Sequence, residues 1–136
     1  MADLTRRLFL SFDHHDLVPA WQFRAHAKRL WASVEFLEHP VKAPFDSRAA
    51  AAIHRDVRGC IAAASTTLCL IGERTYASRW VDWEVRTSAE LGKRVIGVRL
   101  RRHEADLVPD ALAAHGVDII DPDPALIAAA MARAAG

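Results

Sequence analysis

Short hydrophobic runs alternate with longer amphipathic segments along this chain. An apolar run with few charges is typical of a strand buried in a sheet, and RLFLSF, TTLCLI and RVIGVRL are runs of this kind. SVEFL alternates apolar and polar residues, as a half-buried strand does. The pattern predicts five strands, at residues 7–12, 33–37, 66–71, 94–100 and 117–120.

The segments between these runs predict helices. Ile53, Val57 and Ile61 recur every four residues, which favours a helix over residues 48–64. Ser78 and Gly92 fit the two caps of a helix over residues 78–91. Two further helices are expected, one from Pro19 to about residue 31 and an alanine-rich one from Pro122 or Pro124 onward.

Strands that alternate with helices predict a parallel sheet covered on both faces. For five strands we expect the doubly wound, flavodoxin-like order 2-1-3-4-5, within a single α/β domain over residues 1–136. In that order the connections diverge between strands 1 and 3, and ligands bind there at the carboxyl ends of the strands. The loops at residues 13–19 and 72–79 should therefore open on one shared pocket.

The charge balance of the chain restricts the classes of molecule that the protein is expected to bind. The 136 residues carry 18 basic and 17 acidic side chains, so the formal charge is +1. That balance argues against dedicated binding of nucleic acid or a membrane surface. The chain shows no secretory signal and no apolar stretch of membrane-spanning length, and Cys60 and Cys69 are isolated within apolar segments. We expect a cytoplasmic protein with reduced, core cysteines.

The loop sequences do not match the ligand-binding and catalytic motifs that are common on this fold. Asp13 and Asp16 flank two histidines after the first strand and would repel the phosphate of FMN. No GxGxxG, P-loop, CxxC or HExxH motif is present. Adjacent histidines in one loop rarely converge on one ion, so we expect no metal and no resident cofactor. The aspartates are expected to cap the following helix.

The segment 72–85 is distinctive because it holds two of the four tryptophans. Trp80 and Glu84 are four residues apart and share a helix face, whereas Val81, Val85 and Ala89 form the stripe expected to meet the sheet. Glu84 is therefore expected to lie off the main buried stripe. Position alone favours a surface glutamate near the positive end of the helix dipole.

Three segments in this order, LFLSFDHHD, APFDS and IGERTYASRWVDWEV, followed by LGK, resemble the TIR-like family of small bacterial and archaeal proteins. That family includes the TIR-like sensor proteins of the Thoeris anti-phage system. The similarity covers about residues 6–100, and the C-terminal third matches only in topology. The loop at residues 34–47 lacks the Arg-Asp-x-x-Pro-Gly of ordinary TIR domains.

The resemblance implies an NAD-cleaving or NAD-cyclising activity in which Glu84 is the catalytic residue. It implies that NAD is a substrate rather than a cofactor, that the loop 34–47 gates the site and contacts neighbouring subunits, and that the product signals to a separate effector protein. We expect substrate contacts from residues of the three matching segments: Ser11, Phe12, Asp13, Asp16, Phe45, Thr75, Ser78, Trp80 and Trp83.

Two alternatives remain open. A bare TIR-type module can signal by contact with other TIR domains, without catalysis. Deoxyribosyl transfer also uses a glutamate on a helix, but the motifs do not match it. We further expect the loop 38–47 to be exposed and mobile, because it holds two prolines, an exposed Phe45 and Lys42, and no periodicity.

Overall fold

The computed structural model describes residues 6–31, 33–39, 43–101 and 106–135. Its strands are β1 (Arg6–Ser11), β2 (Val34–Leu37), β3 (Thr66–Ile71), β4 (Arg94–Arg99) and β5 (Ile119–Ile120). Its α-helices are α1 (Leu17–Leu30), α2 (Ala50–Ala63), α3 (Arg79–Glu90), α4 (Asp110–Ala114) and α5 (Pro124–Ala135). Two 3₁₀ turns, η1 (His14–Asp16) and η2 (Thr75–Ala77), follow β1 and β3.

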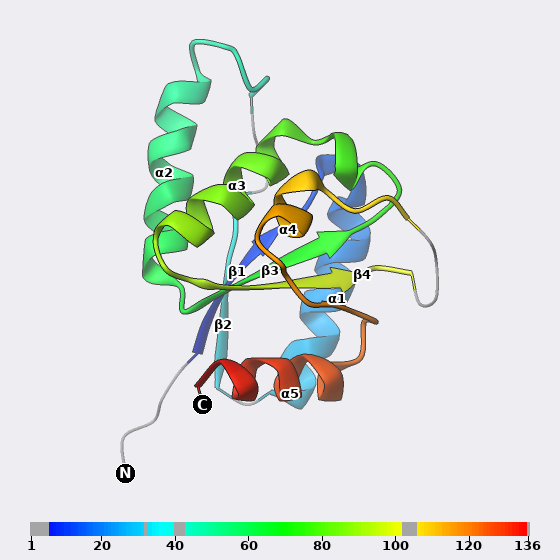
Figure 1. Cartoon of the computed structure of the whole chain (residues 1–136). Coiled ribbons are helices and arrows are strands. Elements are labelled where there is room, and N and C mark those ends of the chain that lie inside the picture. The colour runs from blue at the N-terminus through cyan, green and yellow to red at the C-terminus, as the bar shows by residue number, and fades with distance from the viewer. Residues whose placement is uncertain (1–5, 32, 40–42, 102–105, 136) are drawn as a thin grey trace.

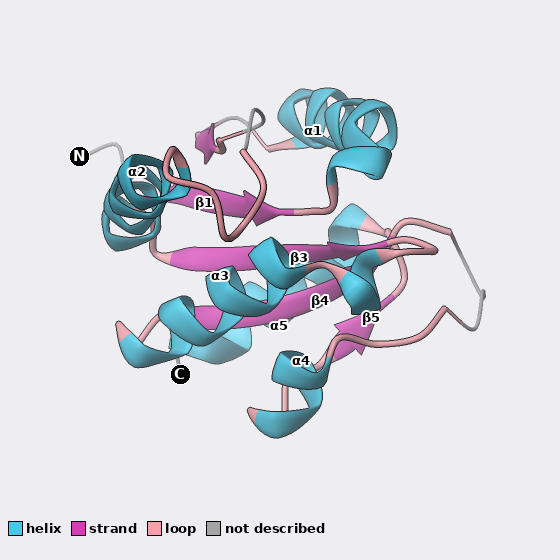
Figure 2. Cartoon of the chain, turned by 90° about the horizontal axis from the view of Figure 1, so that it is seen from above, coloured by secondary structure: helices cyan, strands magenta, loops and turns pink. Residues whose placement is uncertain are grey.

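The five strands form one sheet in the order β2-β1-β3-β4-β5, and every neighbouring pair is parallel. The predicted flavodoxin-like order is therefore confirmed. Figure 1 shows the helices on the two faces of this sheet, and Figure 2 shows the same layers from above. The carboxyl ends of β1 and β3 lie side by side, with Ser11 paired to Cys69.

The core consists of two layers, one on each face of the sheet, because side chains alternate along each strand. Leu8 and Leu10 of β1 pack in one layer with residues of α1 and α5. Phe9 points to the other face and packs with Val57 and Ile61 of α2. β3 is buried along its whole length, as the central strand of a sheet covered on both faces should be.

Most predicted boundaries lie within a few residues of those in the structure. Ser78 caps α3 by accepting a bond from the Val81 amide at 3.2 Å, and Gly92 ends that helix at φ +72°. β5 is shorter than predicted. The five-residue helix α4 was not predicted, because its single turn is too short to produce a helical period.

Within the described part of the chain, no helix has both the length and the apolar character needed to cross a membrane. Both cysteines are free thiols, Cys69 buried in β3 and Cys60 half-buried in α2.

Candidate functional site

A cleft of about 380 Å³ opens at the carboxyl edge of the sheet. Its walls come from the loop after β1, from the segment before α2 and from the start of α3. The lining residues are Phe12, Asp13, His14, Ala43, Pro44, Phe45, Ser78, Arg79 and Trp80. The loops after β1 and β3 thus share one pocket, at the place that the sheet order predicts.

Short polar contacts hold these two loops together. His15 Nε2 lies 3.1 Å from the Arg74 guanidinium, and Thr75 Oγ1 lies 3.5 Å from Asp16 Oδ2. Thr75 Oγ1 also accepts a bond from the Gly72 amide at 2.7 Å. A Cβ on Gly72 would lie 2.3 Å from Asp16 Oδ2, so a larger residue here would force the Asp16 carboxylate to move.

Asp13 and Asp16 have different roles, which corrects the expectation that both cap the following helix. Asp13 caps the turn η1, because its Oδ2 accepts the His15 amide at 3.0 Å. Asp16 makes no capping hydrogen bond to α1 and instead lies against Gly72 and Thr75. Partial burial, with the neighbouring charge of Asp13, raises the pKa of Asp16.

Glu84 is fully buried, which corrects the expectation that it lies off the buried stripe at the surface. The Ser11 hydroxyl donates to its Oε1 at 2.7 Å. Neither residue lines the cleft, but each is fully buried behind a residue that does, Ser11 next to Phe12 in the chain and Glu84 one helical turn from Trp80. The reason is that a large part of the circumference of α3 is buried. This helix packs against the sheet, α2 and α4, so Thr87 and Ser88 are buried beside Glu84 as well.

Four aromatic rings pack together between α2, α3 and the segment before α2. His54 is their centre: its ring centroid lies 4.9 Å from Phe45, 4.5 Å from Trp80 and 4.6 Å from Trp83. The Trp80 indole also donates to the Ala43 carbonyl at 2.9 Å. Phe45 is therefore half-buried rather than exposed, because its edge packs on Trp80. Lys42 lies outside the described residues.

Arg79 holds the same segment from its exposed side. Its guanidinium forms a two-pronged ion pair with Asp46 and lies 4.6 Å from the centre of the Phe45 ring. Sequence reasoning missed both Arg79 and His54. The signal was weak, since neither belongs to a catalytic motif and their partners are distant in sequence.

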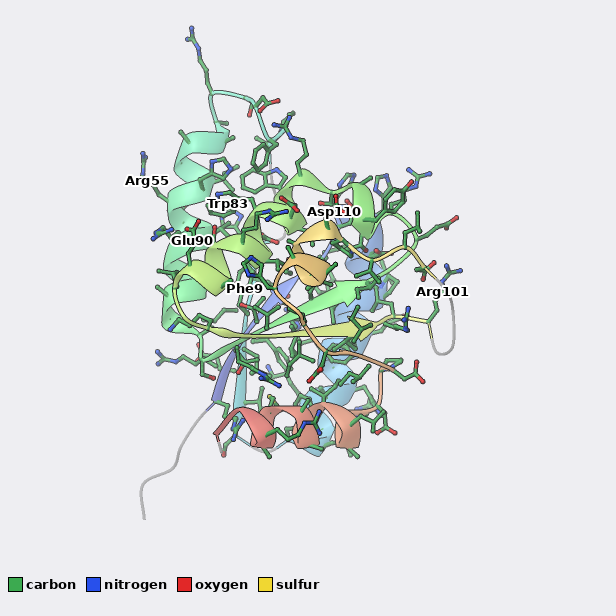
Figure 3. The ribbon with its side chains drawn as sticks, in the orientation of Figure 1. Phe9, Arg55, Trp83, Glu90, Arg101 and Asp110 are labelled. Carbon is green, nitrogen blue, oxygen red and sulfur yellow. The ribbon has the colours of Figure 1, made fainter. Side chains whose placement is uncertain are left out.

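A second cavity of about 460 Å³ lies on the other side of Arg79, toward α4. Two of its lining residues, Trp83 of α3 and Asp110 of α4, are labelled in Figure 3. Trp83 lines this cavity and not the first one. Of the residues expected to contact substrate, the first cleft is lined by Phe12, Asp13, Phe45, Ser78 and Trp80. Ser11 lies beneath that cleft with Glu84, and Asp16 and Thr75 lie where the two loops meet.

The loop after β1 brings ligand-type atoms of Asp13, His14 and His15 within 4.8 Å of one another. His15 has both ring nitrogens engaged: Nδ1 lies 2.6 Å from Asp13 Oδ2, and Nε2 accepts from Arg74. Arginine can only donate, so the neutral imidazole carries its proton on Nδ1 and donates it to Asp13. In this structure the contacts of His15 with Asp13 and Arg74 hold the loop in place.

The parallel sheet, its order and the cleft at its switch point define a flavodoxin-like α/β protein with a glutamate buried under the cleft. The family model described as "Thoeris protein ThsB, TIR-like domain" matches residues 9–105, which is more than half of the chain. The chain belongs to this TIR-like family. The resemblance seen in the sequence motifs is confirmed.

Among curated proteins, this chain is similar to one from Bacillus cereus (strain MSX-D12) named "Putative cyclic ADP-D-ribose synthase ThsB1". The two are 29% identical over 106 residues, which cover 71% of this chain and 53% of that protein. The chain thus matches about half the length of this relative.

One solved structure is similar in fold. A chain in a structure titled as a GCN5-related glucosamine N-acetyltransferase region of a fungal multi-domain GH3 β-N-acetylglucosaminidase gives a TM-score of 0.53 at 15% identity. That match covers 91% of this chain and 13% of the other. The TIR domains of the activated Roq1 resistosome give a TM-score of 0.48 at 16% identity, covering 70% and 57% of the two chains.

Proposed function

We propose that this protein cleaves the bond between nicotinamide and ribose in NAD, with Glu84 as the catalytic carboxylate. The observation that carries the proposal is a glutamate buried under a cleft at the switch point of a TIR-like sheet. The name of the Bacillus cereus relative, a cyclic ADP-ribose synthase, supports the same substrate.

One carboxylate is sufficient for this reaction. Glycosidases usually need a second group to protonate the leaving sugar oxygen. Nicotinamide in NAD is already a pyridinium cation and leaves as a neutral molecule when the electrons of the breaking C–N bond move to its nitrogen. The remaining demand is to stabilise an oxocarbenium-like ribose, which an ionised glutamate can do by charge and by accepting bonds from the ribose hydroxyls.

Trp80 is the tryptophan that lines the cleft, so we assign the nicotinamide ring to it. A pyridinium cation over an indole ring gains about 0.5–2 kcal/mol. Glu84 lies one turn further along the same helix and is completely covered in this structure. Part of its surroundings must therefore move before substrate reaches the carboxylate. We propose that the segment 43–47, bonded to Trp80 through Ala43, is the part that moves.

The reaction can end in two ways. In a site that excludes water, another group of the same molecule captures the ribosyl cation and gives a cyclic ADP-ribose-type product. In an open site water captures it. We propose the cyclic product, which would then act on a separate effector in anti-phage defence.

The test compares nicotinamide release from NAD by wild type and by Glu84→Gln. If the charge stabilises the oxocarbenium, the variant should lose activity by on the order of a hundredfold or more. Glu90→Gln is the matched control, because Glu90 is exposed at the far end of the same helix (Figure 3). It should turn over NAD as wild type does.

Calorimetric titration with NAD tests the alternative function, a non-catalytic interaction module. A wild-type protein that neither binds NAD nor releases nicotinamide would favour that alternative. A folded Glu84→Gln protein with wild-type turnover would remove Glu84 from the mechanism.

A further inference from the structure

Two cavities lie next to each other on α3, each with its own tryptophan. Trp80 lines the cleft of about 380 Å³, and Trp83 lines the cavity of about 460 Å³ beside α4. The two indole rings are 6.1 Å apart at centroid and nearly perpendicular, at 89°. Phe45, Ser78 and Arg79 line both cavities, so these residues form the ridge between them.

The second cavity has the walls that a flat, amine-bearing ring requires. Two aromatic rings line it, those of Trp83 and Tyr76, and Tyr76 has 51% of its surface exposed. Asp110, the first residue of α4, supplies carboxylate oxygens that accept from amino or hydroxyl groups. Asp82 is already paired with Arg86 at 2.9 Å. The chemistry of this cavity fits a purine nucleoside.

The ridge carries a group that fits phosphate. Arg79 grips both carboxylate oxygens of Asp46, and both side chains are more than half exposed. The fork of a guanidinium binds a phosphate through the same two-pronged geometry. Asp46 thus occupies the position on Arg79 that a phosphate would take.

We propose that the cavity beside α4 is the subsite for the adenosine half of the dinucleotide. The purine stacks on Trp83, and the phosphates that join the two halves replace Asp46 on Arg79. This inference rests on the proposed function, which puts nicotinamide on Trp80. Each cavity has a volume within the range of about 300–1,000 Å³ typical of ligand sites, so each has room for one half of the dinucleotide.

The two halves of NAD are the probes: adenosine monophosphate (AMP) and nicotinamide mononucleotide (NMN). Each of the four tryptophans gives one indole N–H signal in a ¹⁵N-correlated NMR spectrum. AMP should shift the Trp83 signal, and NMN should shift the Trp80 signal. Trp21 lies on α1 and lines neither cavity, so its signal should stay in place with both ligands.

Single-residue variants measure how much each side chain contributes to the affinity for AMP and for NMN. Trp83→Leu should weaken AMP about tenfold, because stacking of a base on an aromatic ring contributes about 1–3 kcal/mol, and should leave NMN within twofold. Arg79→Gln should weaken both ligands about tenfold, since each carries a phosphate. Asp46→Asn should tighten both by up to about fivefold, because the competing carboxylate is removed. Trp21→Leu should change neither.

Tyr76→Ala is a second variant for the case that Trp83→Leu does not fold. The Tyr76 ring is half exposed, so its removal should leave the fold intact. It should weaken AMP only. The inference is overturned if AMP shifts Trp80 rather than Trp83, or if neither Trp83→Leu nor Tyr76→Ala weakens AMP more than NMN. In either case NMN binding and nicotinamide release would persist. Failure of the proposed function looks different: NMN would not bind and NAD would not be cleaved.

Discussion

Glu84 is fully buried, so its surroundings must stabilise the carboxylate whenever it is ionised. Taking a carboxylate out of water is costly, and the Ser11 hydroxyl offsets part of that cost with a bond of 2.7 Å. In the proposed function the residue therefore contributes to the fold and to catalysis in different ways. A change that removes the charge and keeps the shape acts on function first, whereas a change that removes the side chain acts on the fold.

Melting experiments should separate these two effects. Glu84→Gln keeps an oxygen for Ser11 and removes a buried charge, so its melting temperature should equal or exceed that of wild type. Glu84→Ala leaves a cavity and a buried hydroxyl that has lost its acceptor, and should lose about 1–3 kcal/mol of unfolding free energy. Circular dichroism melts measure both. Equal losses in the two variants would contradict this separation.

Asp16 gives stability a dependence on pH. Its pKa is raised in the folded protein, chiefly by burial, so the folded state holds the proton more tightly than the unfolded state. Stability from this group is therefore greatest below its unfolded value of 3.8 and is lost as pH rises through the raised pKa. Asp16→Asn should be more stable than wild type at pH 7, and the difference should shrink toward pH 3.

Urea titrations of both proteins at pH 7 and at the lowest pH where both stay folded provide the measurement. A difference that is constant across pH would exclude ionisation of Asp16 as its cause.

At the scale of elements, hydrophobic period predicted the sheet well. The strands were visible because apolar runs such as TTLCLI are buried on both sides, and alternation with helices then restricted the sheet to one common order. The helix α4 was invisible because a single turn has no period. The burial of Glu84 was missed for a related reason: the sequence of α3 shows one apolar stripe, but contact with α2 and α4 buries its polar neighbours too.

The cleft was partly predictable. Topology placed the loops after β1 and β3 together, and the motif pointed to Trp80 and Glu84. The partners of the segment 43–47 were not predictable, because Arg79 and His54 meet Asp46 and Phe45 only after α2 and α3 have packed side by side. Such contacts leave no local pattern in the sequence.

The bond from the Trp80 indole to the Ala43 carbonyl should set how often the segment 43–47 opens. Trp80→Phe keeps a ring but removes the donor. A neutral hydrogen bond contributes about 0.5–1.5 kcal/mol, so the Ser47 amide, bonded to the Pro44 carbonyl at 2.9 Å, should exchange about fivefold faster.

Hydrogen exchange followed by NMR gives this rate. Trp21→Phe, which removes a comparable indole donor on α1, is the control and should leave Ser47 unchanged. Unchanged Ser47 exchange in Trp80→Phe would mean that the aromatic rings alone hold the segment.

At the scale of the whole molecule, the segment 43–47 lies at the mouth of the site, where the resemblance to TIR domains places contacts with neighbouring subunits. We expect self-association and a specific activity that climbs with protein concentration. Nicotinamide release measured over a hundredfold range of concentration tests this, beside sedimentation of the same samples. A specific activity independent of concentration would count against assembly.

The two thiols report on opening at different scales. Burial raises the pKa of the Cys69 thiol, and the nearby charge of Glu84 adds to this effect. Partial burial also raises the pKa of Cys60, though this thiol is half exposed. A thiol reagent at pH 8 should therefore label Cys60 first and Cys69 only at the rate of global unfolding. In a Cys60→Ser variant only Cys69 can be labelled. Fast labelling of Cys69 in that variant would show that β3 opens locally.

The pairing of Ser11 with Glu84 also has a consequence for synthesis on the ribosome. The two residues are 73 positions apart, and they meet only when β1, β3 and α3 have come together. A nascent chain that has emerged only as far as β3 can pair its first strands, but it has no acceptor from α3 for the hydroxyl at the end of β1. The bond between Ser11 and Glu84 thus forms only after α3 has joined the first strands, and a chain released before α3 is made lacks it.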